Sequence, residues 1–198
     1  MNVDNVFIGN MALAHLGSPS VQSFDQPNTA SKVLKQVFEA ARIEALNATL
    51  WNFASMWQVG IRLDLDPKPG WSYVFSYPAD ALRVFEILRS SVDEIEIPFE
   101  VTDRPDGNAG KIIHCNMIAP TFIYSRDKAD PATFDMDFIV ALSWLIASKI
   151  AMPLTKSAKM ADRAEQRWMM YSSLASVRTK DEGPRDRDKT ASYQAVRG

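Results

Sequence analysis

The stretch LNATLWNFASMWQVGIRLDL, residues 46–65, is where the hydrophobic period of the chain changes. Before it, apolar residues recur at the spacing of a helix. After Ala54, apolar residues occupy every second position, which is the period of a β-strand with one buried face. The alternating apolar residues are Trp57, Val59, Ile61, Leu63 and Leu65. The stretch therefore predicts a passage from helices into sheet, with this row of side chains facing the core.

Two helices are predicted before this point. Residues 3–16 form the first, which Gly17 ends as a C′ residue. Asn28 or Thr29 caps the second, which runs to about residue 50. The predicted buried stripe of this helix comprises Leu34, Val37, Phe38, Ala41 and Ala45.

A β-rich region follows. The proline- and glycine-rich segment 66–70 is typical of a turn, and the segment 106–110 is typical of a hairpin loop. Pro98 favours an edge position for its strand, because proline donates no ladder hydrogen bond. The six predicted strands are 57–65, 71–77, 81–88, 94–101, 111–117 and 121–125.

The chain then returns to helical spacing. A helix is predicted from the proline-containing start at 130–133 to Pro153, which we expect to break it, and a last helix at 155–174. The segment 138–150 is apolar on most sides. Such a helix is either central to its own fold or packed against a neighbouring subunit. From residue 176 the sequence is polar, and the segment is either a flexible end or an extended arm that folds onto a partner; we expect the arm.

These elements predict an α+β protein. Its helical bundle is built from 1–54 and 128–175, with an inserted antiparallel sheet or sandwich at 55–127 and an extended C-terminal arm at 176–198. The formal net charge of −2 argues against a dedicated nucleic-acid binder. One cysteine excludes an intrachain disulfide and a multi-cysteine zinc site. The uncharged apolar run 138–148 is shorter than the roughly 20 residues of a membrane span.

No catalytic motif is complete. His114 and Cys115 are neighbours on a predicted strand, so they point to opposite faces and form no dyad. The segment 107–111 lacks the glycine and hydroxyl positions of a phosphate loop, and Asp103, Asp106 and Asn108 lack calcium-loop spacing. We therefore expect no enzyme, no cofactor and no metal.

Two other functions use surface residues of the β region. A glycan-degrading tail enzyme would need two converging carboxylates, and the candidates are Glu94, Glu96 and Glu100. The strand alternation instead places these three on one solvated face. A sugar- or base-binding module would expose Trp71 and Tyr73, whereas the alternation of Trp51, Trp57, Trp71, Tyr73 and Phe75 favours core positions.

The order of motifs resembles the tail tubular protein A family, the head-to-tail adaptors of short-tailed phages. The similar stretches cover most of 10–171. Thr49 and Leu50 stand where the family often has a His-Pro pair. The stretches are NMALAHLGSPSV at 10–21, ARIEALNATLWNFA at 41–54, WSYVFSYPADALRVFEI at 71–87 and FDMDFIVALSWLIASKIAMPLT at 134–155.

This resemblance implies a structural virion protein, made in the host cytoplasm and located in the tail or neck. Family members form a ring, a dodecamer, between the portal protein and the tail nozzle, around a channel that DNA passes without specific binding. No membrane is implied. The apolar helix 138–150 would have surface to spare for the ring. We expect the arm to contact the portal or a neighbouring protomer through Arg178, Lys180, Arg185, Arg187, Tyr193 and Arg197.

Overall fold

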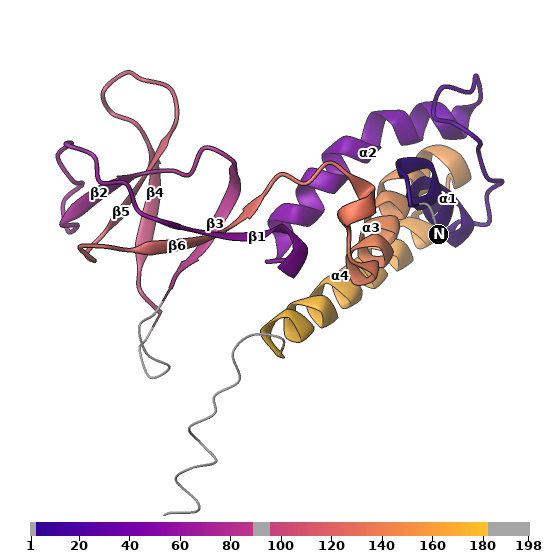
Figure 1. Ribbon diagram of the computed structural model, residues 1–198. Helices are drawn as coiled ribbons and strands as arrows, with labels where there is room; N and C mark the ends of the chain where they lie inside the picture. Colours follow the sequence, from indigo (N-terminus) through magenta and orange to yellow (C-terminus); the bar gives the residue numbers. More distant parts are fainter. Residues whose placement is uncertain (1–2, 89–95, 182–198) are drawn as a thin grey trace, which may run out of the picture. The chain divides into compact units, whose positions relative to one another are not determined.

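The computed structural model describes residues 3–88 and 96–181, in two compact units (Figure 1). The helical unit comprises Met1–Met56, Asp80–Val84 and Tyr124–Ser176. The β unit contains Trp57–Ala79 and Phe85–Ile123. The predicted α+β class is confirmed: the helices from the two ends of the chain pack together, and two three-stranded antiparallel sheets are inserted between them.

The first two helices begin and end where local chemistry favours it. Asp4 caps α1 (Asn5–His15) by accepting from the backbone N–H of Phe7 at 2.7 Å, and Gly17 follows the helix with a positive φ of 67°. Asn28 caps α2 (Thr29–Ala48), accepting from the N–H of Ser31 at 2.8 Å. The predicted stripe of α2 faces the core, with Leu34, Phe38, Ala41 and Ala45 buried and Val37 half-buried.

The helix α3 (Met136–Thr155) is the centre of the helical unit. By length and composition it is apolar enough to cross a membrane, and its place in the core accounts for that composition. The prediction that Pro153 breaks it was wrong. Pro153 lies in the last turn, the helix continues for two more residues, and Lys156 ends it in the left-handed conformation at φ 54°. A proline this close to a C-terminus disturbs only the last turn.

The helix α4 (Ala158–Asp181) extends beyond its predicted end at residue 174. No glycine or proline interrupts the sequence until Gly183 and Pro184, so nothing stops the helix earlier. The first residues of the predicted arm are therefore helical, and residues 182–198 lie outside the described part of the chain. Ala164 and Trp168 of α4 join the same core as α3.

Aromatic side chains bind the helical core together. Phe53 lies in the short 3-10 helix η1 (Asn52–Ala54), Trp51 directly precedes it, and Phe134 follows a second one, η2 (Pro131–Thr133). All three rings surround or adjoin Phe138 of α3, with ring centroids 4.9–5.0 Å from it. Trp51 also donates its indole N–H to the carbonyl of Ala45 at 2.8 Å. The residues at the change of period thus belong to the helical core.

The β unit is built around two sheets. One has the strand order β1–β6–β3 and the other β2–β5–β4, which places β4 at an edge and agrees with the prediction from Pro98. The division between the two units falls within β1, β3 and β6. The strands are β1 (Ser55–Val59), β2 (Tyr73–Ser76), β3 (Ala81–Ile87), β4 (Phe99–Asp103), β5 (Lys111–Cys115) and β6 (Thr121–Arg126).

Gly60 is the point where the chain leaves β1 and joins the second sheet. Its N–H bonds to the carbonyl of Pro120 at 2.7 Å, and residues 61–63 then pair with β2 through an isolated bridge between Arg62 and Phe75. A Cβ at Gly60 would lie 2.8 Å from Phe75 and 2.9 Å from Phe122. Only glycine allows the strand to cross this closely over the two rings.

The predicted burial of the period-two row was wrong for its first three members. Trp57, Val59 and Ile61 are 70%, 55% and 59% exposed. The alternation identifies two faces of a strand but does not say which of them is buried. Here Gln58 and Gly60 take the inner positions, and Gly60 is the residue that fits against Phe75 and Phe122.

Candidate functional site

The most elaborate polar arrangement of the β unit lies under the loop 64–72, which we call the strap. Both ends of the strap are fixed by main-chain pairing: Leu63 donates to the carbonyl of Val74 at 2.9 Å, and Ser76 to that of Ile61 at 2.9 Å. Within it, the backbone N–H of Trp71 donates to the carbonyl of Lys68 at 3.0 Å, and Gly70 has a φ of 94°. The segment predicted as a turn is therefore an ordered cover.

The strap lies over one face of the sheet β2–β5–β4. In the register of this sheet, His114 of β5 is opposite Val74 of β2 and Glu100 of β4, and Ile112 is opposite Thr102. Opposite residues of an antiparallel pair, and those two positions along, share a face. Val74, Ile112 and His114 are all buried. The strap explains why β5 is buried on both faces.

Two side chains of the sheet hold the strap by hydrogen bonds. Glu100 forms an ion pair with Lys68 and accepts from the indole N–H of Trp71 at 3.0 Å. His114 accepts from the backbone N–H of Lys68 at its Nδ1, at 3.4 Å. Its Nε2 must then carry the hydrogen of the neutral ring, and it donates to Thr102 Oγ1 at 3.0 Å.

The environment shifts the pKa of both Glu100 and His114, the two residues that hold the strap. The hydrogen bonds from Lys68 and then Trp71 hold the pKa of Glu100 below its ordinary value. Burial lowers the pKa of His114, an effect that the Lys68 charge supports and the Glu100 charge opposes. At neutral pH the site therefore contains an ionised carboxylate and a neutral imidazole.

A cavity of about 240 Å³ adjoins this network. Its lining residues are Asp66, Pro67, Lys68, Thr102, Asp103, Pro105, Ile112 and His114. Both nitrogens of His114 and both carboxylate oxygens of Glu100 already have protein partners. Within residues 3–88 and 96–181, no group of histidine, cysteine or acidic residues could hold a metal ion. The geometry favours a structural pin over a reacting centre.

The predicted carboxylate candidates do not converge. Glu100 takes part in the strap network, but its side chain is still 37% exposed, so the predicted solvated face is only partly covered by the strap at this position. Glu96 is exposed and precedes β4, and Glu94 lies outside the described residues. Among described residues, Glu100 is thus the one candidate of the three with a built environment.

The other candidate motifs take the structural roles that were predicted. His114 and Cys115 point to opposite faces of β5, and the buried Cys115 thiol donates to the carbonyl of Met117. Burial raises the pKa of this thiol, which keeps it protonated and unreactive. In the loop 104–110, Asp106 pairs with Arg104 and accepts from Asn108, so it holds a turn. The Arg104 and Asn108 contacts lower the pKa of Asp106.

The aromatic candidates are divided between core and surface. Trp51 and Phe75 are buried, as predicted, while Tyr73 is half-buried and lies under the Arg62 guanidinium, 4.7 Å from the ring centroid. Trp71 is half-buried and pinned to Glu100. Trp57 is the large exposed ring. These positions do not form a stacking platform.

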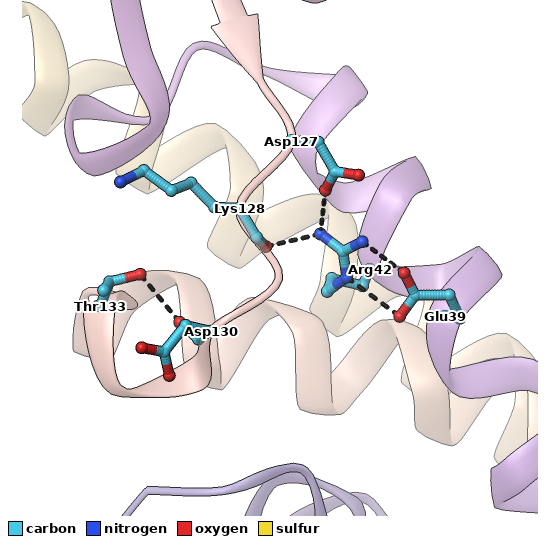
Figure 2. A network of polar contacts seen from close by, with 6 residues as sticks. All are labelled: Glu39, Arg42, Asp127, Lys128, Asp130 and Thr133. Atoms are coloured by element: carbon cyan, nitrogen blue, oxygen red, sulfur yellow. Dashed lines mark hydrogen bonds and ion pairs between the residues drawn. The ribbon is translucent and has the colours of Figure 1, made fainter. Parts of the chain in front are cut away.

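An important residue that the sequence patterns missed is Arg42 of α2. Its side chain is 1% exposed, and it bonds to Glu39, to Asp127 at 2.5 Å and to the carbonyl of Lys128 at 2.5 Å (Figure 2). Burial alone would lower the pKa of Arg42, but the bonds to Glu39 and Asp127 outweigh burial and raise it. This contact fixes the segment that leaves β6 onto the helical unit. One signal was its position on the buried face of α2.

The exposed apolar side chains of the β unit form the second notable surface. Trp57 and Val59 of β1 and Ile61, which follows Gly60, alternate along the chain, and we call them the apolar row. Leu88 and Ile118 of the same unit are 50% and 71% exposed. Of the predicted arm residues, Arg178 and Lys180 lie on α4, and Arg185, Arg187, Tyr193 and Arg197 lie outside the described residues.

No protein-family model and no curated protein matches the chain. Two features of the described residues bear on function most directly: a polar network whose groups already have partners, and a row of exposed apolar side chains.

Proposed function

We propose that the chain is a structural protein of a phage virion, a head-to-tail adaptor. It assembles as a ring, a dodecamer, between the portal protein and the tail nozzle, around the channel that DNA leaves through. The observation that supports this most is the apolar row of Trp57, Val59 and Ile61. Large apolar side chains exposed close together on a surface favour a protein–protein contact.

Burial of the apolar row at an interface would stabilise an assembly. Fully burying one large apolar side chain is worth roughly 1.5–3 kcal/mol. A ring uses a head-to-tail interface, in which one surface of a protomer meets a different surface of the next. Repeating a modest contact around a closed ring gives a stable assembly without a strong dimer.

The surface assigned to the ring contact differs from the one that the sequence suggested. The helix segment 138–150 was expected to offer spare apolar surface, but its large side chains are taken up by the core of its own unit. Of its residues, Phe138, Leu142, Ile146 and Ile150 are fully buried. The apolar row of the β unit therefore replaces α3 as the proposed contact.

The charge of the chain supports passage of DNA without binding. A DNA-binding surface needs clustered Lys and Arg to replace counterions on the phosphates. The chain has 22 basic and 24 acidic residues and a net charge of −2. Basic residues of the described part pair with acidic ones at several places, including Lys35 with Asp25 and Lys149 with Glu44. A channel of such subunits would hold DNA weakly.

A glycan-degrading tail enzyme is the alternative from another class. Glu100 already serves two hydrogen-bond donors, Lys68 and Trp71, which disfavours it as a general acid or nucleophile. The triple variant Glu94→Gln, Glu96→Gln, Glu100→Gln separates the two functions. An adaptor retains portal attachment in this variant, whereas loss of polysaccharide cleavage by an otherwise folded variant would establish the enzyme.

Native mass spectrometry tests the proposal, using the full chain alone and mixed with the portal protein encoded in the same genome. We expect a portal-bound ring. The double variant Trp57→Ser, Ile61→Ser should abolish the ring, while Met169→Ser, which changes an exposed methionine of α4, should not. A wild-type protein that ignores the portal would overturn the proposal. A ring that survives the double variant would overturn the assignment of the contact.

The C-terminal segment is a separate part of the proposal. Beyond the end of α4 at Asp181, its composition, polar and mixed in charge, favours ordering only on a partner. We assign Arg178, Lys180, Arg185, Arg187, Tyr193 and Arg197 to contacts with the portal or a neighbouring protomer. Deletion of 176–198 should weaken portal attachment in the same experiment. Unchanged attachment would remove this segment from the proposal and leave the apolar row untouched.

A further inference from the structure

We propose that His114 is an acid-sensitive latch: protonation of its Nδ1 releases the Lys68 backbone of the strap, residues 64–72, from the face of the sheet β2–β5–β4. The proposal does not depend on the adaptor function. It rests on the position of one buried imidazole between a loop and a sheet, and on the hydrogen-bonding role of each of its nitrogens.

The geometry makes one hydrogen bond sensitive to the proton. Nε2 carries the hydrogen in the neutral ring and donates to Thr102 Oγ1, and it does the same in the charged ring. Nδ1 accepts from the N–H of Lys68 when the ring is neutral. After protonation Nδ1 becomes a donor, and two N–H groups then point at each other. The contact that is lost is the one between the ring and the strap backbone.

The charges around the ring affect how readily His114 is protonated. From the strap, Lys68 and Asp66 face this region, and from β4, Glu100 and Asp103 do so. Glu100 favours the charged ring, but its oxygens are occupied by Lys68 and Trp71. Burial disfavours the charged ring and lowers the pKa of His114. The latch therefore stays closed at neutral pH and opens at a pH below the ordinary pKa of histidine.

The fold limits the opening to the strap. Both ends are fixed by the pairing of 61–63 with β2, so the loop moves between two held points. Ser72 also donates to Asn116 Oδ1 at 2.8 Å close to one end. Glu100 still holds the Lys68 and Trp71 side chains after the imidazole contact is lost. The opening is therefore local to the Lys68 backbone, beside the cavity that Ile112 lines together with Asp66 and Pro67.

Amide hydrogen exchange measured by NMR tests the latch on the full chain. The observable is the protection factor of the Lys68 amide, that is, its exchange rate corrected for the pH dependence of exchange in an unfolded peptide. We expect protection to fall about fivefold between about pH 7.5 and about pH 5, the effect of losing one ordinary hydrogen bond. The Leu63 and Ser76 amides, at the fixed ends, should keep their protection.

The chain has only two histidines, which makes the controls clean. His114→Gln should remove the pH dependence of Lys68 protection, and His15→Gln in the helical unit should leave it intact. If His114→Gln does not fold, the wild-type protein alone tests the proposal. The pH titrations of the His114 ring resonances and of the Lys68 protection factor must then have the same midpoint. Protection that does not change with pH, a dependence that persists in His114→Gln, or two different midpoints would each overturn the latch.

Discussion

The helical unit and the β unit use their apolar residues in opposite ways. In the helical unit, α3 is surrounded, and Phe138 lies among the rings of Trp51, Phe53 and Phe134. In the β unit, the large side chains Trp57, Val59 and Ile61 stay outside, and polar pins hold a loop over the sheet. The first arrangement buries its large apolar side chains, and the second leaves several of them exposed.

The two units also differ in how they use a buried polar side chain. Arg42 is charged and ties a connecting segment to α2 with bonds to two carboxylates and a carbonyl. His114 is neutral and ties the strap to β5 with one backbone hydrogen bond. A guanidinium keeps its charge at any physiological pH, whereas an imidazole does not. The helical connection is therefore permanent, and the strap contact is conditional.

The largest loss of stability is expected for a substitution in the helical core. Phe138→Ala should lower the free energy of unfolding by about 4 kcal/mol, because it removes a fully buried ring and leaves a cavity among three others. Urea unfolding followed by far-UV circular dichroism measures it. Met136→Ala, at an exposed position of the same helix, should change stability by less than about 0.5 kcal/mol. Similar losses for both would mean that α3 is not the centre of this unit.

The second effect removes the permanent connection. Arg42→Met should destabilise the protein by about 2 kcal/mol, because the Lys128 carbonyl and two carboxylates lose their shared donor. The value lies below that of a wholly buried pair, since Glu39 and Asp127 are half exposed and can hydrate. Glu39→Gln, which keeps Arg42 and Asp127, should cost less than about 1 kcal/mol in the same assay. A stable Arg42→Met protein would contradict the role of this contact.

The sequence predicted the helical unit better than the β unit, for a physical reason. A 3.6-residue period identifies one buried stripe, so Leu34, Phe38 and Ala41 could be placed in the core of α2 before the structure was known. A period of two offers two faces, and Trp57 lies on the exposed face although it was predicted to lie on the buried one. The choice depended on Gly60, whose neighbours come from distant strands.

The strap site was beyond sequence reasoning for a related cause. Its residues come from a loop and two strands, and what joins them is the return of 64–72 over the sheet. Proline and glycine at 67–70 correctly predicted a turn, but turn chemistry does not say where a loop folds back. Arg42 was partly predictable, because its position continues the buried stripe of α2. Its partners, the Asp127 carboxylate and the Lys128 carbonyl, come from a segment far along the chain.

The third effect compares a glycine from each unit. Gly60→Ala should destabilise by about 2 kcal/mol, since the new methyl group meets Phe75, Phe122 and Pro120 within 2.9 Å. Gly9→Ala in α1 also meets a ring, that of Phe24 at 2.9 Å. There the helix gains about 1 kcal/mol from alanine, so the net change should be near zero. Equal losses at both sites would mean that the strand crossing at Gly60 is no tighter than an ordinary helix contact.

The smallest effect concerns the histidine of the helical unit. His15 stacks on Trp144 with ring centroids 3.5 Å apart, and its Nε2 lies 2.9 Å from Ser143 Oγ. That hydroxyl donates to the Val140 carbonyl, so His15 donates to it in turn. Burial lowers the pKa of His15. Because Nε2 is a donor in both forms of the ring, protonation should break no hydrogen bond here.

The sign of the resulting pH dependence follows from proton linkage. A histidine whose pKa is lower in the folded state binds more protons when unfolded, so its contribution is full above the unfolded value of about 6.5 and declines as the pH falls toward the folded value. Unfolding free energies of wild type and His15→Gln, measured from about pH 7.5 to about pH 5, should diverge only modestly in slope. The His114→Gln slope should differ from wild type by more, because there acid also breaks the strap contact. A steeper change at His15 would reverse the comparison and make the helical unit the acid-sensitive one.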